Sequence, residues 1–157
     1  MPLLLSNLKT PIGTLNLLAD ERFLIAANFS SISALGSYTD VKSVKTIPVI
    51  TELISDYFAG DLDALNGIQV RQEGPKFSQA AWKVMRKVKA GKTLSYADLA
   101  DRAGSPAAVR AAGSACAKNA IVLVVPCHRI VKTGGALGNY AYGLSKKEWL
   151  LSHEGAL

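Results

Sequence analysis

The sequence predicts two folded units, a small α/β unit over residues 1–74 and a mostly helical unit over residues 75–157. Three observations lead to this prediction. The first part of the chain alternates short apolar runs with turn residues, which is typical of β-strands. The second part places apolar residues at helical spacing. Between them, at Glu73-Gly74-Pro75, the balance of charged residues changes sign, and we place the boundary there.

The first unit is expected to contain three or four strands and one helix. Residues 48–58 carry apolar side chains at helical spacing, and Gly60 is placed to end that helix. Strands are predicted in the short apolar-rich runs, which are residues 3–8, 12–18, 23–29 and 68–71. Together these elements make a small α/β unit.

The second unit is expected to begin with a helix whose buried stripe consists of Phe77, Ala81, Val84 and Val88. Ser95 starts a second helix with a capping box, and Ser105-Pro106 opens a third helix with the serine as its cap. Two short helices joined in this way are typical of a helix-turn-helix, which would display Arg110 to a duplex. Such pairs also occur in protein cores, so this pattern leaves both explanations open.

The last part of the chain combines an apolar run, a cysteine and a glycine-rich loop. A continuous apolar run at residues 121–125 predicts a buried strand. It leads to Pro126-Cys127-His128-Arg129-Ile130, after which come the glycine-rich loop and a helix from about residue 145 to residue 152. The strand would therefore deliver the cysteine to the end of the sheet.

The net charge of +6 is unevenly distributed along the chain. Residues 1–75 carry 5 basic and 8 acidic side chains, whereas residues 76–132 carry 11 basic and 2 acidic ones. A positive field of this kind suits a polyanion such as nucleic acid, because neutralising phosphates releases condensed counterions. A solvated surface with chance clustering would give the same counts, so charge alone does not decide between the two.

The composition argues against membrane and metal-binding classes. No apolar run approaches the roughly 20 residues of a membrane span, and the N-terminus lacks the features of a signal peptide. We therefore expect a cytoplasmic protein, or a nuclear one if the source is eukaryotic, with no membrane partner. Its two cysteines, Cys116 and Cys127, are expected to stay reduced. The histidines His128 and His153 do not join them in a metal-ligand spacing, so no metal site is expected.

Cys127 is the strongest candidate for a reactive residue. The imidazole of His128 and the guanidinium of Arg129 follow it directly, and both favour the thiolate that acts as nucleophile. Because neighbouring strand residues point to opposite faces, His128 can assist only where the chain turns, or through a water molecule. Glu154 could orient the imidazole, as in a nucleophile–base–orienter triad. A capped strand end with a structural histidine explains the same residues equally well.

Pro126-Cys127-His128-Arg129-Ile130 resembles the active-site signature of the O6-alkylguanine-DNA alkyltransferases, also called methylated-DNA–protein-cysteine methyltransferases. The resemblance covers nearly all of residues 74–157, and residues 1–73 match more loosely. The ordered matches are Phe77, Trp82, Ser95-Tyr96, Val109-Arg110-Ala111-Ala112-Gly113, Lys118-Asn119, Gly138-Asn139-Tyr140, Lys147-Glu148-Trp149-Leu150-Leu151 and His153-Glu154-Gly155.

The resemblance implies repair of alkylated DNA by a single-turnover transfer to Cys127, with no cofactor. His128, backed by Glu154, would take the thiol proton through water. Tyr96 would rotate the target phosphate and assist the departing guanine, and Asn119 would brace the turn before the active-site segment. The implied fold is a small antiparallel sheet plus helix, RNase H-like, followed by a winged helix-turn-helix.

The implied partner is double-stranded DNA containing O6-alkylguanine or O4-alkylthymine, bound through its minor groove by a monomer. Arg110 would fill the gap that the flipped nucleotide leaves in the base stack. Further DNA contacts are expected from small or polar residues of the helix pair, which are Ser95, Tyr96, Ala111 and Gly113. The residues implied for the pocket are Tyr140, Ile130, Gly138, Ala141 and Cys116, the last as a small apolar side chain rather than a nucleophile.

Tyr142 departs from the family pattern, which has a small residue there, and we expect it to narrow the tolerance for large adducts. Three rival functions remain to be weighed. A non-catalytic lesion binder of the same family would lack the reactive cysteine. A helix-turn-helix regulator would not explain residues 126–130 or Glu154, and a cysteine hydrolase draws its histidine from a distant segment.

Overall fold

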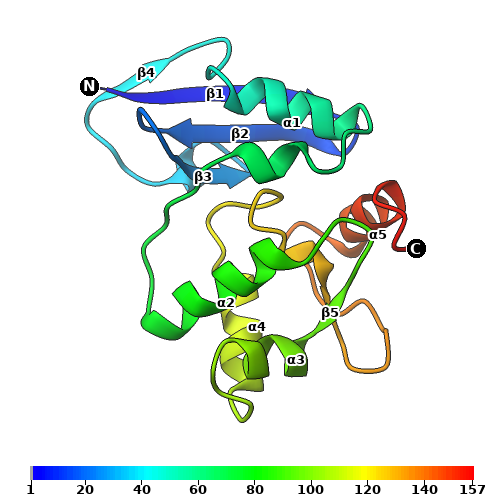
Figure 1. Ribbon diagram of the computed structural model, residues 1–157. Helices are drawn as coiled ribbons and strands as arrows, with labels where there is room; N and C mark the ends of the chain where they lie inside the picture. Colours follow the sequence, from blue (N-terminus) through cyan, green and yellow to red (C-terminus); the bar gives the residue numbers. More distant parts are fainter. Residues whose placement is uncertain (1) are drawn as a thin grey trace. The chain divides into compact units, whose positions relative to one another are not determined.

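The computed structural model describes residues 2–157, which form two compact units (Figure 1). The first unit runs to Gln72 and also includes Ala120–Val124, and the second comprises Glu73–Asn119 and Val125–Leu157. Ala120–Val124 joins the first unit because the amide of Ala27 donates to the Ala120 carbonyl, and the amide of Val122 donates to the Ala27 carbonyl. The division predicted at residue 74 did not include this excursion.

A four-stranded sheet forms the first unit, in the order β3-β2-β1-β4. Its strands are β1 (Leu3–Thr10), β2 (Gly13–Ala19), β3 (Leu24–Asn28) and β4 (Val41–Ser43). The first three pair antiparallel, which confirms the strands predicted at residues 3–8, 12–18 and 23–29, but β4 pairs parallel with β1. The sheet is therefore mixed, and the expectation of a purely antiparallel sheet is wrong.

The fourth strand lies elsewhere in the sequence than predicted. Residues 68–71 make only an isolated bridge, between Leu24 and Val70, and are not a strand. Strand β4 is fully exposed and lacks the apolar alternation by which strands are recognised. Its position at the edge of the sheet explains both features, because an edge strand needs little apolar surface.

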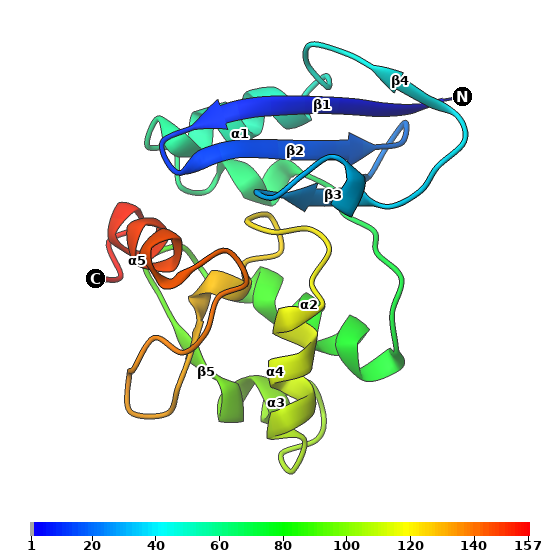
Figure 2. The same cartoon turned by 180° about the vertical axis from the view of Figure 1, so that it is seen from behind.

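Helix α1 (Ile50–Phe58) lies across one face of this sheet, as both views show (Figures 1 and 2). Ile50, Ile54 and Tyr57 are buried on its inner side, which confirms the predicted helix. Short 3₁₀ helices, η1 (Ser33–Leu35) and η2 (Ala64–Gly67), complete the unit. Leu15 and Leu17 of β2 are fully buried, so the core lies around the central strand.

The second unit is mainly helical. Its helices are α2 (Lys76–Lys87), α3 (Tyr96–Arg102), α4 (Val109–Ala117) and α5 (Leu144–His153). The indole Nε1 of Trp82 on α2 donates to the Ala115 carbonyl of α4 at 2.9 Å, which ties these two helices together. A small parallel sheet pairs β5 (Leu94–Ser95) with β6 (Ile130–Val131). Within residues 2–157, no helix has both the length and the apolar character needed to cross a bilayer.

Two elements predicted between residues 75 and 157 are wrong. Helix α4 begins at Val109, and Ser105 and Ala108 instead close a turn in which the Ala108 amide donates to the Ser105 carbonyl. Residues 121–125 form a buried turn rather than a strand, with Leu123 in the left-handed region at φ +74°. Their apolar character predicted burial correctly, but a short apolar run does not distinguish an extended chain from a bent one.

Candidate active site

A single 3₁₀ turn, η3 (Cys127–Arg129), places the candidate nucleophile and its two neighbours. Successive residues of a 3₁₀ helix point about 120° apart, so three neighbouring side chains leave the backbone in three directions. The chain does turn at this point, which meets one of the two conditions given for cooperation between Cys127 and His128, the other being a relay through water. The side chain of Cys127 is only 8% exposed, yet it lies on the wall of a pocket of about 820 Å³.

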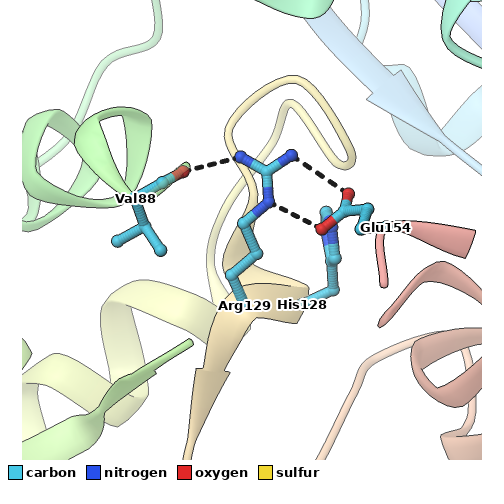
Figure 3. Close-up of polar contacts among 4 residues, drawn as sticks. All are labelled: Val88, His128, Arg129 and Glu154. Atoms are coloured by element: carbon cyan, nitrogen blue, oxygen red, sulfur yellow. Dashed lines mark hydrogen bonds and ion pairs between the residues drawn. The ribbon is translucent and has the colours of Figure 1, made fainter. Parts of the chain in front are cut away.

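Behind the turn, His128 and Arg129 both reach Glu154 at the end of α5 (Figure 3). Nε2 of His128 lies 2.8 Å from Oε2 of Glu154. Nε and Nη2 of Arg129 donate to the two oxygens of the same carboxylate at 2.9 Å and 3.0 Å, and Nη1 donates to the Val88 carbonyl at 2.7 Å. All three side chains are buried. The bidentate ion pair between Arg129 and Glu154 holds the carboxylate in place, and the carboxylate in turn orients the imidazole of His128.

The charges in this buried cluster are well defined. Burial acts to raise the pKa of Glu154, but the hydrogen bond from His128, together with the hydrogen bonds and the charge of Arg129, outweighs it and lowers the pKa to about 2. Burial lowers the pKa of His128, against the attraction of Glu154, so the imidazole is neutral near pH 7. With its one proton donated from Nε2 to the carboxylate, Nδ1 is an acceptor, and it has no hydrogen-bond partner within residues 2–157.

The expected activation of Cys127 by its two neighbours is wrong in this structure. Burial raises the pKa of the Cys127 thiol, while the side chain of Asn119 and the charge of Lys147 act to lower it. Arg129 is directed to Glu154 and Val88 instead, and the neutral His128 supplies no positive charge. The thiol is therefore protonated at rest, and forming the thiolate requires a base.

The pocket of about 820 Å³ brings together most of the residues predicted for it. Gly138 has φ +75°, and a side chain there would come within 3.1 Å of the Tyr96 ring, so only glycine lets the loop approach this closely. The predicted residues that line the pocket are Tyr96, Arg110, Gly113, Cys116, Cys127, Gly138, Tyr140 and Ala141.

Besides His128 and Glu154, which lie behind the turn, four predicted residues lie outside the pocket wall. Ser95 caps α3, because its Oγ accepts from the Asp98 amide at 3.0 Å. The Nδ2 of Asn119 donates to the Val125 carbonyl at 2.8 Å and so spans the buried turn. Ile130 is fully buried, and Ala111 is exposed on α4. No group of three or more His, Cys, Asp or Glu side chains that could hold a metal ion occurs between residues 2 and 157.

Comparisons with known proteins agree with this geometry. A family model described as the DNA-binding domain of 6-O-methylguanine DNA methyltransferase matches residues 76–156, more than half of the chain. The chain belongs to the 6-O-methylguanine DNA methyltransferase family. A methylated-DNA–protein-cysteine methyltransferase of Shigella flexneri is 33% identical over 99% of this chain and 97% of its own. The human protein of that name is 51% identical over 49% of this chain and 37% of its own.

Solved structures extend the likeness to both units of this methyltransferase. The crystal structure of Mycobacterium tuberculosis OGT in complex with DNA matches with a TM-score of 0.85 and 30% sequence identity, covering 98% of this chain and 93% of that one. A Pyrococcus kodakaraensis O6-methylguanine-DNA methyltransferase, at 20% identity and a TM-score of 0.64, shares the fold.

Several residues of the site in this methyltransferase were not predicted from the sequence. The missed pocket residues are Val109, Ser114, Ala117, Lys132 and Asn139. Helical spacing from Arg110 and Gly113 could have found those on α4. Lys147 was noted only as part of a motif, yet it is fully buried and its charge acts on Cys127. Its signal was a lysine three and four residues before Leu150 and Leu151, on the buried side of α5.

Proposed function

We propose that this DNA-repair methyltransferase removes the alkyl group from O6-alkylguanine in duplex DNA and transfers it irreversibly to Cys127. Its substrates are proposed to include O4-alkylthymine. A thioether has no leaving group that water could displace under cellular conditions, so each molecule acts once. The observation that carries the proposal is the Cys127 thiol on the wall of a pocket, followed in the same turn by a neutral, buried imidazole whose Nδ1 can accept a proton.

The transfer starts when the substrate occupies the pocket. His128 Nδ1 takes the Cys127 proton through a water molecule, and the positive imidazole is stabilised by Glu154, whose pKa of about 2 keeps it ionised. The sulfur attacks the alkyl carbon, a C–S bond forms, and the C–O6 bond breaks with its electrons left on guanine. A neutral histidine suits this role, because its Nδ1 is free to accept the proton while Nε2 stays bonded to the carboxylate.

Tyr96 is proposed to help the departing guanine. Its ring lies on the pocket wall, and burial, followed by the charges of Cys116 and Cys127, raises the pKa of its hydroxyl to about 12. The phenol therefore keeps its proton at neutral pH and can donate a hydrogen bond to the base as negative charge appears on it. The carbonyls of Cys127 and Ile130 would accept from the exocyclic amine.

The helix pair α3–α4 is proposed to bind the minor groove as part of a winged helix-turn-helix. Arg110 is exposed near the start of α4 and also lines the pocket, a position suited to replacing a base that has rotated out of the stack. The small residues Ala111 and Gly113 would allow the DNA backbone to come close, and residues 76–132 supply the positive field. The RNase H likeness of the first unit, a monomeric state and a cytoplasmic location also stay predictions.

Peptide mass measurement tests the proposal. The protein is incubated with duplex DNA containing one O6-methylguanine and then digested. We expect one methyl group on the peptide that contains Cys127, no methylation in Cys127→Ser, and full methylation of Cys127 in the matched control Cys116→Ser. An unmodified Cys127 peptide from protein that still binds the lesion would support a lesion binder instead.

A further inference from the structure

Helix α5 has a lysine on its buried side, where most helices have an apolar residue. Lys147 is fully buried, and the other buried residues of the helix are Leu150 and Leu151. Glu154 follows seven residues after Lys147, so the same side of the helix carries a buried cation and, at its end, a buried anion. The role of Glu154 is explained by His128 and Arg129. The charge of Lys147 also acts to lower the pKa of His128, but its hydrogen bonds go elsewhere. It needs its own explanation, because burying an ammonium group without partners is strongly unfavourable.

The partners of Lys147 are two main-chain carbonyls, one next to the turn that carries Cys127 and one in the pocket wall. Its Nζ donates to the Ile130 carbonyl at 2.7 Å and to the Asn139 carbonyl at 3.3 Å. Ile130 starts β6 directly after the turn that carries Cys127. Asn139 lies in the pocket wall, between Gly138 and Tyr140. One ammonium group thus connects the segment that bears the nucleophile with the loop that forms the wall for the base.

That loop has little regular structure of its own. Residues 132–143 contain no helix or strand. Several of its backbone hydrogen bonds close turns within the loop, such as Lys132 to Ala136 and Gly143 to Tyr140. These bonds shape the loop, but they do not fix its distance from Cys127. The ammonium group of Lys147 fixes this distance, because it donates both to the loop and to the segment that follows Cys127. Such charge-assisted hydrogen bonds are stronger than those between neutral groups.

The ammonium group also acts on the sulfur. The charge of Lys147 lowers the pKa of Cys127, and the charges of Cys127 and Cys116 in turn raise the pKa of Lys147 against the effect of burial. The groups whose charges couple to Cys127 in this region are Lys147, Cys116, Tyr96 and Tyr142. Of these four, Lys147 alone carries a positive charge, so it favours the thiolate that forms during transfer.

We propose that Lys147 is a positioning residue that clamps the pocket loop to the nucleophile's segment and stabilises the Cys127 thiolate through its positive charge. Lys147 need not contact the substrate for either effect. The proposal rests on the proposed function, since it assigns Lys147 to the same transfer reaction. It also predicts how Lys147 changes the reactivity of the Cys127 thiol, which can be measured without DNA.

The first experiment measures the thiol alone. Labelling of Cys127 by iodoacetamide is followed across pH in the full-length protein carrying Cys116→Ser, in this background with Lys147→Met, and with Lys147→Arg. Methionine has similar length but neither charge nor donor, so it should shift the labelling profile to higher pH and slow labelling at neutral pH by about tenfold, the size expected for losing an interaction with a charged group. Arginine should largely restore the profile.

The second experiment measures the loop and the base pocket. Single-turnover transfer is recorded against the concentration of DNA containing O6-methylguanine, together with hydrogen exchange of residues 132–143. Lys147→Met should raise the half-saturating concentration as well as lower the limiting rate, and the loop should exchange faster. The matched control is Lys146→Met on the same helix, which should leave all of these readouts unchanged.

The outcomes separate this proposal from the proposed function. If the unmodified protein transfers no methyl group, the proposed function fails, while thiol labelling and hydrogen exchange still test Lys147. An unchanged labelling profile and unchanged loop exchange in Lys147→Met would overturn the assignment. If that variant does not fold, Lys147→Gln replaces it, and a labelling profile equal to that of the unmodified protein would overturn the assignment in the same way.

Discussion

The two sides of the η3 turn differ in what they are built to do. On the rear side, both carboxylate oxygens of Glu154 are hydrogen-bonded by His128 and Arg129, and all three side chains are buried. On the front side, Cys127 lines a pocket bounded by α4, Tyr96 and an irregular, glycine-containing loop. Under the proposed function, the buried cluster holds the general base, His128, whereas the side that would admit a nucleobase is bounded in part by a loop without helix or strand.

The largest effect is expected from replacing His128, the proposed general base behind the η3 turn. His128→Asn should slow methyl transfer by about 10²–10⁴-fold, the usual contribution of a general base, because no neutral imidazole would take the Cys127 proton. The measurement is the single-turnover rate at saturating lesion DNA, with lesion affinity determined in parallel. Transfer within a few-fold of the unmodified protein would show that the rear cluster is only structural.

Breaking the ion pair between Arg129 and Glu154 tests whether the buried cluster behind the η3 turn stabilises the fold. Glu154→Gln should lower the free energy of unfolding by about 3–5 kcal/mol, since the buried Arg129 charge would lose its partner. Denaturant unfolding measures this loss. Glu148→Gln, on the exposed side of the same helix, is the matched control and should change stability by less than about 0.5 kcal/mol. Equal effects of the two substitutions would contradict the account.

Much of this contrast was predictable from the sequence. Cys127, His128 and Glu154 were predicted from residue types together with the family resemblance, and helical spacing predicted α1 and α2. The bent path of residues 121–125 was not predictable, because an apolar run reports burial and not backbone direction. The orientation of Arg129 and the buried position of Lys147 depend on α5 packing against a segment distant in sequence, which local patterns do not encode. Strand β4 was missed because it has no apolar pattern.

On the front side, Tyr142 should limit which adducts fit. Its ring packs edge-to-face on Tyr140, with 5.7 Å between the ring centres, so it supports the pocket wall from outside. Tyr142→Ala should raise the rate with O6-benzylguanine relative to O6-methylguanine by about tenfold, the discrimination that small changes in pocket size produce. Competition between the two substrates measures the ratio. The exposed Tyr38 provides the control Tyr38→Ala, and an unchanged ratio in Tyr142→Ala would remove the proposed role.

The smallest effect concerns pH and again belongs to the rear side. The pKa of His128 is lowered in the folded protein, so below about pH 6.5 the unfolded chain binds a proton that the native state does not. Stability should therefore be fully present above that pH and decline as the pH falls below it. Glu154 adds a further loss only as the pH falls from about 4.5 toward about 2. Unfolding curves from pH 8 to pH 4 test this, and the decline near pH 6 should be absent in His128→Asn.

Following the methyl group itself tests the central claim most directly. Duplex DNA carrying O6-methylguanine with a ¹³C-labelled methyl group is added in increasing amounts, and the protein is observed by NMR. The account predicts a single S-methyl resonance that stops growing at one methyl per protein and is absent in Cys127→Ser. A resonance that persists in Cys127→Ser, or one that grows past one methyl per protein, would contradict it.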